Sequence, residues 1–220
     1  MKRTSAAEVV IVVNSGGWGN IPIERCPEVL PIVKGIADYL DSCGWRVVVV
    51  PFSRAPVDSP ATTPSPITQL ITVAEMLSIH HSRARALVRE IESLVQRNPD
   101  LRFVLLGISN GAVFVDQATG LLSPLADSRV VAIEIGPPSW HGRYKAENIL
   151  QLDNEGQDPL TQGKFEEVFA SLLGGFMKFA FNLFTGNPTR FEEIWHIPGH
   201  DYPWEAIRHK VCLFLSQSFN

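Results

Sequence analysis

Short runs of adjacent apolar residues alternate along the chain with longer segments in which apolar residues recur every three or four positions. Short continuous apolar runs are typical of strands buried on both faces of a sheet, and the longer spacing is typical of helices. The runs predict strands at 9–14, 45–52, 102–106, 129–135, 148–152 and 191–197. The helical spacing predicts helices at 27–43, 110–122, 165–184 and 204–215, and a further one between 67 and 96.

This alternation predicts an α/β fold with a mainly parallel central sheet of about six strands, flanked by helices on both faces. Four consecutive valines at 47–50 indicate that the second strand is buried. The Pro-, Ser- and Thr-rich segment 53–66 predicts a surface loop rather than a linker. We therefore expect residues 1–220 to form a single domain. Such sheets bind ligands at the carboxyl ends of their strands, so functional residues should follow strands directly.

The helix predicted at 165–184 approaches the length of a membrane span, but it contains Glu166, Glu167 and Lys178. We do not interpret it as a transmembrane segment. Its apolar residues spread around the helix, so we expect it to be buried between the sheet and neighbouring elements. An acyl-chain groove and a homodimer face are the two alternatives.

Composition and charge argue against several classes of function. The net charge is −4 and the basic residues are scattered, which argues against nucleic-acid binding. The three cysteines, Cys26, Cys43 and Cys212, form no CxxC pair, which favours buried free thiols over disulfides or zinc. Lys2 and Arg3 precede an apolar run too short for a signal peptide, so we expect a cytoplasmic protein. No pattern for a metal or organic cofactor occurs.

The segment joining the third predicted strand to the next helix contains Gly107-x-Ser109-x-Gly111. In this pattern the serine lies on a strained strand-to-helix turn, where only glycine fits beside it. The turn exposes the serine oxygen and places the N–H of Asn110 near developing negative charge. Ser109 is therefore the predicted nucleophile. The alternative is an ordinary glycine-rich turn with Ser109 capping the helix.

These features resemble the α/β-hydrolase superfamily, and within it a small, lidless serine esterase. The resemblance implies the order nucleophile, acid, histidine. It implies that His200, in the segment 197–202 before the last helix, is the general base. Gly156 followed by Asp158 resembles the family's acid loop, which makes Asp158 the predicted acid, with Asp153 and Glu155 as rivals.

The resemblance also implies an oxyanion hole formed by Asn110 and by a donor from the loop after the first strand. Gly17 is the favoured donor, and Gly16 and Trp18 are the alternatives. The histidine of the family's His-Gly pattern is missing from this loop. The short connection 136–147 leaves no room for a lid domain, so the site should be open, with Trp140 and His141 lining the substrate pocket.

The predicted reaction is hydrolysis of a small-molecule ester or thioester through a Ser-His-Asp triad and an acyl-enzyme intermediate, without metal or cofactor. A hydrolase-like fold serving as a non-catalytic ligand receptor or interaction module is the first alternative. A nucleotide-dependent oxidoreductase is the second, because Gly17-x-Gly19 follows a strand. Pro22, however, stands where a dinucleotide-binding fingerprint needs its third glycine.

Overall fold

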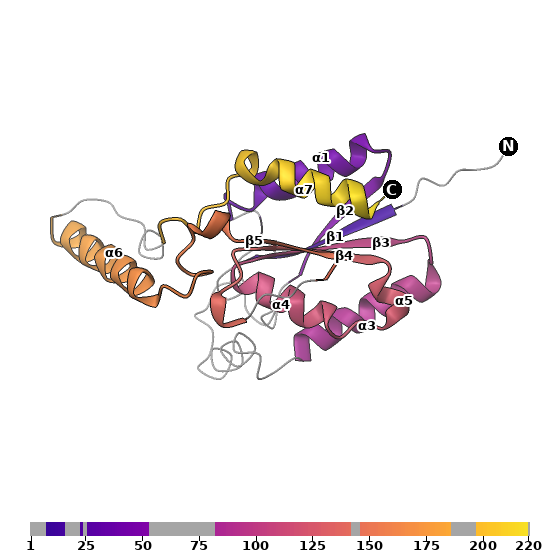
Figure 1. Ribbon diagram of the computed structural model, residues 1–220, viewed down its shortest axis with the longest axis horizontal. Coiled ribbons are helices and arrows are strands. Elements are labelled where there is room, and N and C mark those ends of the chain that lie inside the picture. Colours follow the sequence, from indigo (N-terminus) through magenta and orange to yellow (C-terminus); the bar gives the residue numbers. More distant parts are fainter. Residues whose placement is uncertain are drawn as a thin grey trace.

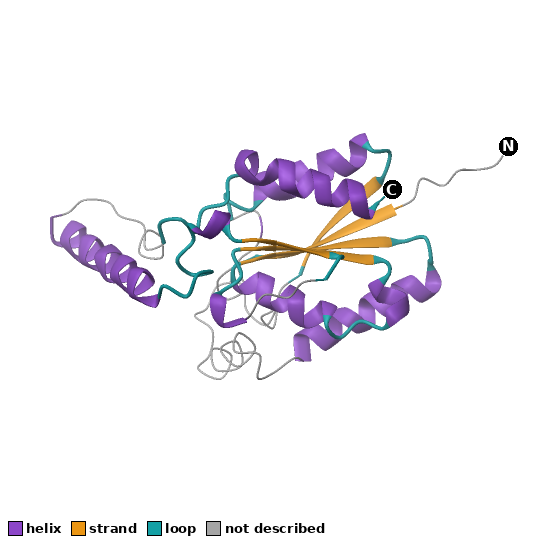
Figure 2. Ribbon diagram, viewed as in Figure 1, coloured by secondary structure: helices purple, strands orange, loops and turns teal. Residues whose placement is uncertain are grey.

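A central parallel sheet with helices on both faces organises the chain (Figures 1 and 2). The computed structural model describes residues 8–15, 23, 26–52, 82–141, 146–185 and 197–219. The strand order is β2-β1-β3-β4-β5, and every neighbouring pair is parallel. The strands are β1 (Glu8–Asn14), β2 (Arg46–Pro51), β3 (Arg102–Ile108), β4 (Val130–Ile135) and β5 (Ile149–Leu152).

The predicted fold class is confirmed, with five strands rather than six in the described part of the chain. The expected sixth strand, 191–197, lies outside the described residues except for Ile197, which is not in a strand. One face of the sheet is covered by α1 (Leu30–Ser42) and α7 (Trp204–Ser218). The opposite face is covered by α3 (Ser82–Arg97), α4 (Asn110–Thr119) and the short α5 (Pro124–Asp127) (Figure 1).

Alternate residues of the inner strands fill two separate cores. Ile11, Leu106 and Ile133 pack toward α1 and α7. Val12, Leu105 and Ala132 pack toward α3 and α4. Because successive side chains of a strand point to opposite faces, a strand covered on both sides must be apolar at nearly every position. This explains the apolar runs of β1 and β3 and that of β4 as far as Glu134.

The second strand differs from its predicted environment. β2 lies at the edge of the sheet, and Val48, Val49 and Val50 are each 39% exposed. The prediction that this strand is buried is therefore wrong. A run of β-branched residues indicates extended backbone, but it carries no information about whether the strand is central or peripheral.

The helix α6 (Phe165–Thr185) also differs from expectation. It lies apart from the sheet and the five helices that cover it (Figure 1), and none of its side chains that the structure describes is buried. The prediction that this helix packs between the sheet and its neighbours is therefore wrong. Helical periodicity reveals an apolar surface, but not what covers it. No helix in the described residues has both the length and the apolar character needed to cross a membrane.

Candidate active site

Ser109 lies on a tight turn between β3 and α4, at the carboxyl end of the sheet. Its backbone has φ 54° and ψ −120°, a region that costs energy for a residue with a Cβ. Its N–H donates to the carbonyl of Ile135 at 2.7 Å, which fixes the turn to the end of β4. Ser109 precedes α4 directly, but its side chain makes no capping hydrogen bond. The geometry therefore differs from an ordinary N-cap, which has extended backbone and a bonded side chain.

The two glycines of the motif are required by close backbone approach. A Cβ on Gly107 would lie 2.3 Å from the carbonyl oxygen of Gly111. A Cβ on Gly111 would lie 2.3 Å from the carbonyl oxygen of Asn14, at the end of β1. Any side chain at either position would separate α4 from the sheet. The pattern Gly-x-Ser-x-Gly thus follows from the packing of this turn.

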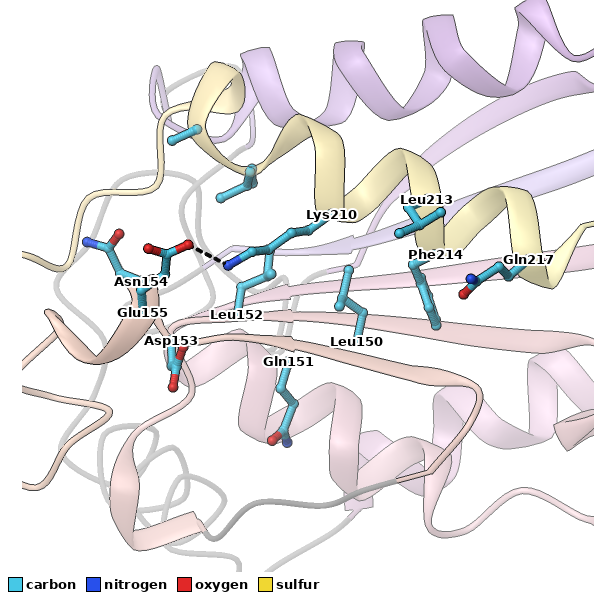
Figure 3. Close-up of a pocket in the computed structure, with 12 residues that line it drawn as sticks. Leu150, Gln151, Leu152, Asp153, Asn154, Glu155, Lys210, Leu213, Phe214 and Gln217 are labelled. Carbon is cyan, nitrogen blue, oxygen red and sulfur yellow. Dashed lines mark hydrogen bonds and ion pairs between the residues drawn. The ribbon is translucent and has the colours of Figure 1, made fainter.

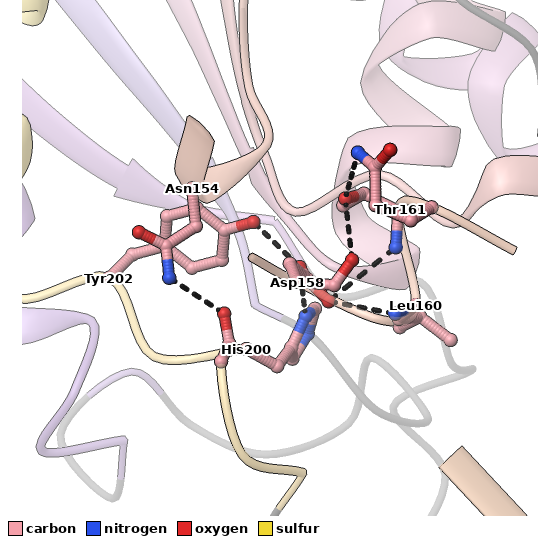
Figure 4. Close-up of polar contacts among 8 residues, drawn as sticks. Asn154, Asp158, Leu160, Thr161, His200 and Tyr202 are labelled. Atoms are coloured by element: carbon pink, nitrogen blue, oxygen red, sulfur yellow. Dashed lines mark hydrogen bonds and ion pairs between the residues drawn. The ribbon is translucent and has the colours of Figure 1, made fainter. Parts of the chain in front are cut away.

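Asp158 is fully buried and is the carboxylate that contacts His200. Its Oδ2 lies 2.7 Å from Nδ1 of His200 and accepts a 2.6 Å hydrogen bond from the hydroxyl of Tyr202. Its Oδ1 accepts hydrogen bonds from the backbone N–H groups of Leu160 at 2.9 Å and Thr161 at 3.4 Å (Figure 4). Glu155, one of the rival acids, pairs instead with Lys210 at 3.0 Å.

These hydrogen bonds decide the charge of Asp158. Burial alone raises its pKa, but the hydrogen bonds from His200, Tyr202 and the Leu160 N–H outweigh that effect and lower the pKa below its ordinary value. Burial and the adjacent carboxylate raise the pKa of Tyr202. At neutral pH, Asp158 is therefore an anion and Tyr202 a neutral donor. An anion at Nδ1 favours the His200 tautomer whose Nε2 is free to accept a proton.

Gly136 connects the histidine to the serine turn. A Cβ on this residue would lie 2.7 Å from Cε1 of His200 and 2.9 Å from Cε2 of Tyr202. Gly136 follows Ile135, whose carbonyl oxygen accepts the N–H of Ser109. The Ser109 turn and the His200 ring thus both adjoin the carboxyl end of β4. This is the place at which a parallel sheet is expected to bind its ligand.

Asn154 ties the acid loop to the histidine loop. Its side-chain N–H donates to the carbonyl of Gly199 at 2.8 Å, although its backbone is in the left-handed region with φ 52° (Figure 4). Gly199 has φ 86°, and a Cβ there would lie 2.4 Å from the carbonyl oxygen of Gln157. The two loops therefore interlock around the Asp158–His200 contact. No sequence motif predicted that Asn154 or Tyr202 takes part in this network.

Comparison with known proteins bears on the fold. No protein-family model matches the chain, and no curated protein matches it. Solved structures do match. A Trichoderma reesei cutinase bound to a phosphonate inhibitor is 15% identical with a TM-score of 0.52, over 98% of this chain and 78% of the cutinase. A cutinase-like protein from Cryptococcus sp. is 12% identical with a TM-score of 0.54, over 98% of this chain and 96% of that protein. An acetylxylan esterase is 14% identical with a TM-score of 0.55, over 98% of this chain and 99% of the esterase.

The chain has the α/β-hydrolase fold. Identities of 12–15% show the shared architecture alone. Within this hydrolase fold, Ser109 follows β3, Asp158 lies in the loop after β5, and His200 precedes α7. The chain order of the three residues is the one that the fold is known to use for a catalytic triad.

The predicted oxyanion donors are only partly described. Asn110 is the first residue of α4, so its N–H lies at the positive end of the helix dipole. Gly16, Gly17 and Trp18 lie outside the described residues.

The two predicted pocket residues differ in environment. Trp140 is 46% exposed and stacks on Phe165 with ring centroids 6.1 Å apart. The His141 side chain is only 8% exposed, and its Nε2 lies 2.6 Å from Oδ2 of Asp116 on α4. Trp140 is thus open to a ligand, whereas His141 anchors the η2 turn (Ser139–His141) to α4.

A second buried carboxylate lies under the serine turn and was not predicted. Glu134 on β4 is opposite Gly107 in the sheet and is fully buried. Its Oε2 accepts a 2.6 Å hydrogen bond from Gln151, and its Oε1 has no hydrogen-bond partner among the residues that the structure describes. Burial raises the pKa of Glu134 to about 8, with a smaller contribution from the charge of Asp116. Near neutral pH this side chain is therefore largely protonated.

Within the described ranges, no group of three or more His, Cys, Asp or Glu side chains is placed to hold a metal ion. The three cysteines are free thiols. Cys26 is buried as predicted, but Cys43 is exposed and Cys212 is half-buried, because they lie at the end of α1 and on the outer part of α7.

A cavity of about 550 Å³ lies between β5 and α7 (Figure 3). The ion pair of Lys210 and Glu155 spans part of it, and Leu150 and Phe214 contribute apolar walls. Neither Ser109 nor His200 is among its lining residues. The candidate active site is therefore the cluster at the strand ends and not this cavity.

Proposed function

We propose that this protein is a serine hydrolase that cleaves a carboxylic ester or thioester of a small molecule. The observation that carries the proposal is the fully buried Asp158 carboxylate bonded to His200. Ser109, on a strained turn whose N–H donates to Ile135, adjoins the same end of β4 as the His200 ring. Burying an anion has a desolvation cost, which the side-chain hydrogen bonds from Tyr202 and the His200 imidazole offset in the described part of the chain. Fold similarity to cutinase and acetylxylan esterase structures supports the same reaction class.

In the first half of the reaction, His200 Nε2 takes the proton of Ser109 as Oγ bonds to the carbonyl carbon of the ester. The carbonyl oxygen becomes an oxyanion held by the N–H of Asn110 and by a second donor, Gly17 or its neighbours Gly16 and Trp18. The imidazolium then gives its proton to the leaving oxygen or sulfur, and that bond to carbon breaks. Asp158 keeps the imidazole oriented and stabilises its positive charge.

In the second half, water replaces the alcohol or thiol. His200 removes a proton from water as the water oxygen bonds to the acyl carbon. The Ser109 Oγ leaves with the proton returned by His200, and the carboxylic acid is released. Every group that this scheme needs is a side chain or a backbone N–H, so it calls for no metal or organic cofactor.

Steady-state hydrolysis of p-nitrophenyl esters tests this proposal. We expect turnover of a short-chain ester by the unaltered protein and its loss in Ser109→Ala, by a factor on the order of 10⁶ in kcat. Acyl-CoA thioesters in the same series separate ester from thioester preference. Turnover of Ser109→Ala within tenfold of the unaltered protein would assign the nucleophile elsewhere. Absence of turnover across both series would favour a non-catalytic ligand receptor.

A further inference from the structure

The described apolar side chains of α6 are open to solvent from the first residue of the helix to its last turn. Seven large apolar side chains are exposed, and Phe184 at the end of the helix is 90% exposed. They are Phe165, Phe169, Leu173, Phe176, Met177, Phe181 and Phe184. Isolated exposed apolar residues are ordinary on soluble proteins, but a contiguous set of this size marks a surface that is covered in use. We call these seven residues the α6 apolar face.

The width of the α6 apolar face distinguishes between kinds of partner. At about 100° per residue, the seven positions spread over an arc of about 160°. The half-exposed Val168, Leu172 and Phe179 border this arc on the side of Phe165, and Glu166, in the first turn, lies within it. A single partner helix covers a narrower seam of residues. A continuous apolar medium covers a broad convex arc at once, and a helix lying in a lipid surface buries such a face to a depth of about 5–10 Å.

The few charges of α6 indicate which kind of apolar surface the helix can bind. Glu166, Glu167 and Lys178 are its only charged residues, and Glu167 is paired with Lys164 at 3.3 Å. Helices that bind anionic lipids carry many Lys or Arg residues beside the apolar face, and α6 has one. Its chemistry therefore fits an uncharged or zwitterionic surface. The helix is about 30 Å long at about 1.5 Å per residue, and it does not qualify as a membrane span, so it would lie along such a surface.

The α6 apolar face begins beside the candidate active site. Phe165, its first residue, stacks on the half-exposed Trp140 in the turn that follows β4. Near the start of the helix, Gly163 approaches Ser139 of the same turn, where a Cβ on the glycine would lie 3.1 Å from the serine Oγ. A surface bound by α6 would thus meet the edge of the sheet at which Ser109 and His200 lie.

We propose that α6 docks this protein on the surface of an uncharged lipid phase, with its apolar face buried in the lipid. Docking goes beyond ester hydrolysis and does not need Ser109 to react. Ser109→Ala should bind lipid as well as the unaltered protein does, so failure of the catalytic proposal would leave this one testable.

Flotation with phosphatidylcholine vesicles tests the proposal. The triple variant Phe169→Ser, Phe176→Ser, Phe181→Ser removes the centre of the apolar face. The matched control, Leu94→Ser, Leu121→Ser, Leu125→Ser, removes three exposed leucines from the α3–α5 side of the molecule. We expect the unaltered protein and the control to float with the vesicles, and the triple variant to bind at least tenfold more weakly. Because the substituted residues are exposed, all three proteins should keep the same far-UV circular dichroism and thermal midpoint.

Lipid docking is overturned if the triple variant floats as well as the unaltered protein, or if neither protein floats. If neither floats and the unaltered protein sediments as a dimer while the triple variant sediments as a monomer, the α6 apolar face is assigned to a second copy of the chain. Added phosphatidylglycerol should not strengthen binding, and a steep gain would show that charge, not the apolar face, drives it.

Discussion

At the scale of single residues, the electrostatics of the site centre on Asp158. Both of its oxygens accept hydrogen bonds while the side chain is shielded from water. Tyr202 and His200 both donate a hydrogen bond to Oδ2 of Asp158. A second hydrogen bond to this oxygen makes it a weaker acceptor for the imidazole N–H. In the proposed mechanism, Tyr202 therefore acts through Asp158 and does not touch the reacting atoms.

Tyr202→Phe removes that donor and tests its role. Loss of the hydrogen bond raises the pKa of Asp158, which strengthens its pull on the imidazolium. We expect the acid limb of the kcat/KM profile to move to higher pH, with kcat on the plateau changed by less than about tenfold. The control is Tyr39→Phe on α1, far from the site in sequence and on another element. A lower thermal midpoint with an unmoved pH profile would restrict Tyr202 to a structural role.

The sequence could propose Ser109, Asp158 and His200 as site residues because each lies in a short motif after a predicted strand or before the last helix. It could not identify Tyr202 or Asn154. Their contacts depend on how two loops, one after β5 and one before α7, fold over each other. Glu134 was missed for a related reason: a single acidic residue in an apolar strand does not reveal that its partner is Gln151 on the neighbouring strand.

At the scale of elements, the joint between β3 and α4 depends on the absence of side chains. Gly111 lies against the end of β1, and Gly107 lies against the first turn of α4. The sequence predicted this joint because strand, motif and helix follow one another without interruption. It did not predict the environments of β2 and α6, since apolar content reports what a segment needs to bury and not where the burial takes place.

Gly111→Ala tests the joint. The added Cβ would lie 2.3 Å from backbone oxygen, so the helix or the strand must shift. We expect the free energy of unfolding to fall by more than about 2 kcal/mol. The matched control is Gly174→Ala in α6, where no atom lies within 4 Å of the new Cβ. That change should leave the free energy of unfolding unaltered or raise it by up to about 1 kcal/mol, because alanine has a higher helix propensity than glycine. Equal effects of the two substitutions would contradict the packing argument.

At the scale of the whole molecule, Glu134 links stability to pH. In the fold its pKa is raised to about 8, whereas its ordinary value is 4.5. Between these values the folded chain holds a proton that the unfolded chain has released, so stability falls as pH rises through this window. Above about pH 8 the cost of a buried charge is complete. Asp158 acts in the opposite sense, because its stabilising contribution is lost only as pH falls below its ordinary value of 3.8.

Glu134→Gln removes this dependence. We expect the variant to be more stable than the unaltered protein at about pH 9 by on the order of 1–3 kcal/mol, and to differ little near pH 4. Urea unfolding at a series of pH values measures the difference. If the difference in the free energy of unfolding between the two proteins is constant over the pH range, or narrows as pH rises, Glu134 does not titrate as its burial predicts.

Covalent labelling tests most directly the proposal that Ser109 is a nucleophile activated by the His200–Asp158 pair. A fluorophosphonate should add to the intact protein once, with the adduct mapped to Ser109 by peptide mass spectrometry. Labelling should be lost in Ser109→Ala and slowed at least 10³-fold in His200→Ala. An adduct on another residue, or labelling of His200→Ala at the rate of the unaltered protein, would contradict the account.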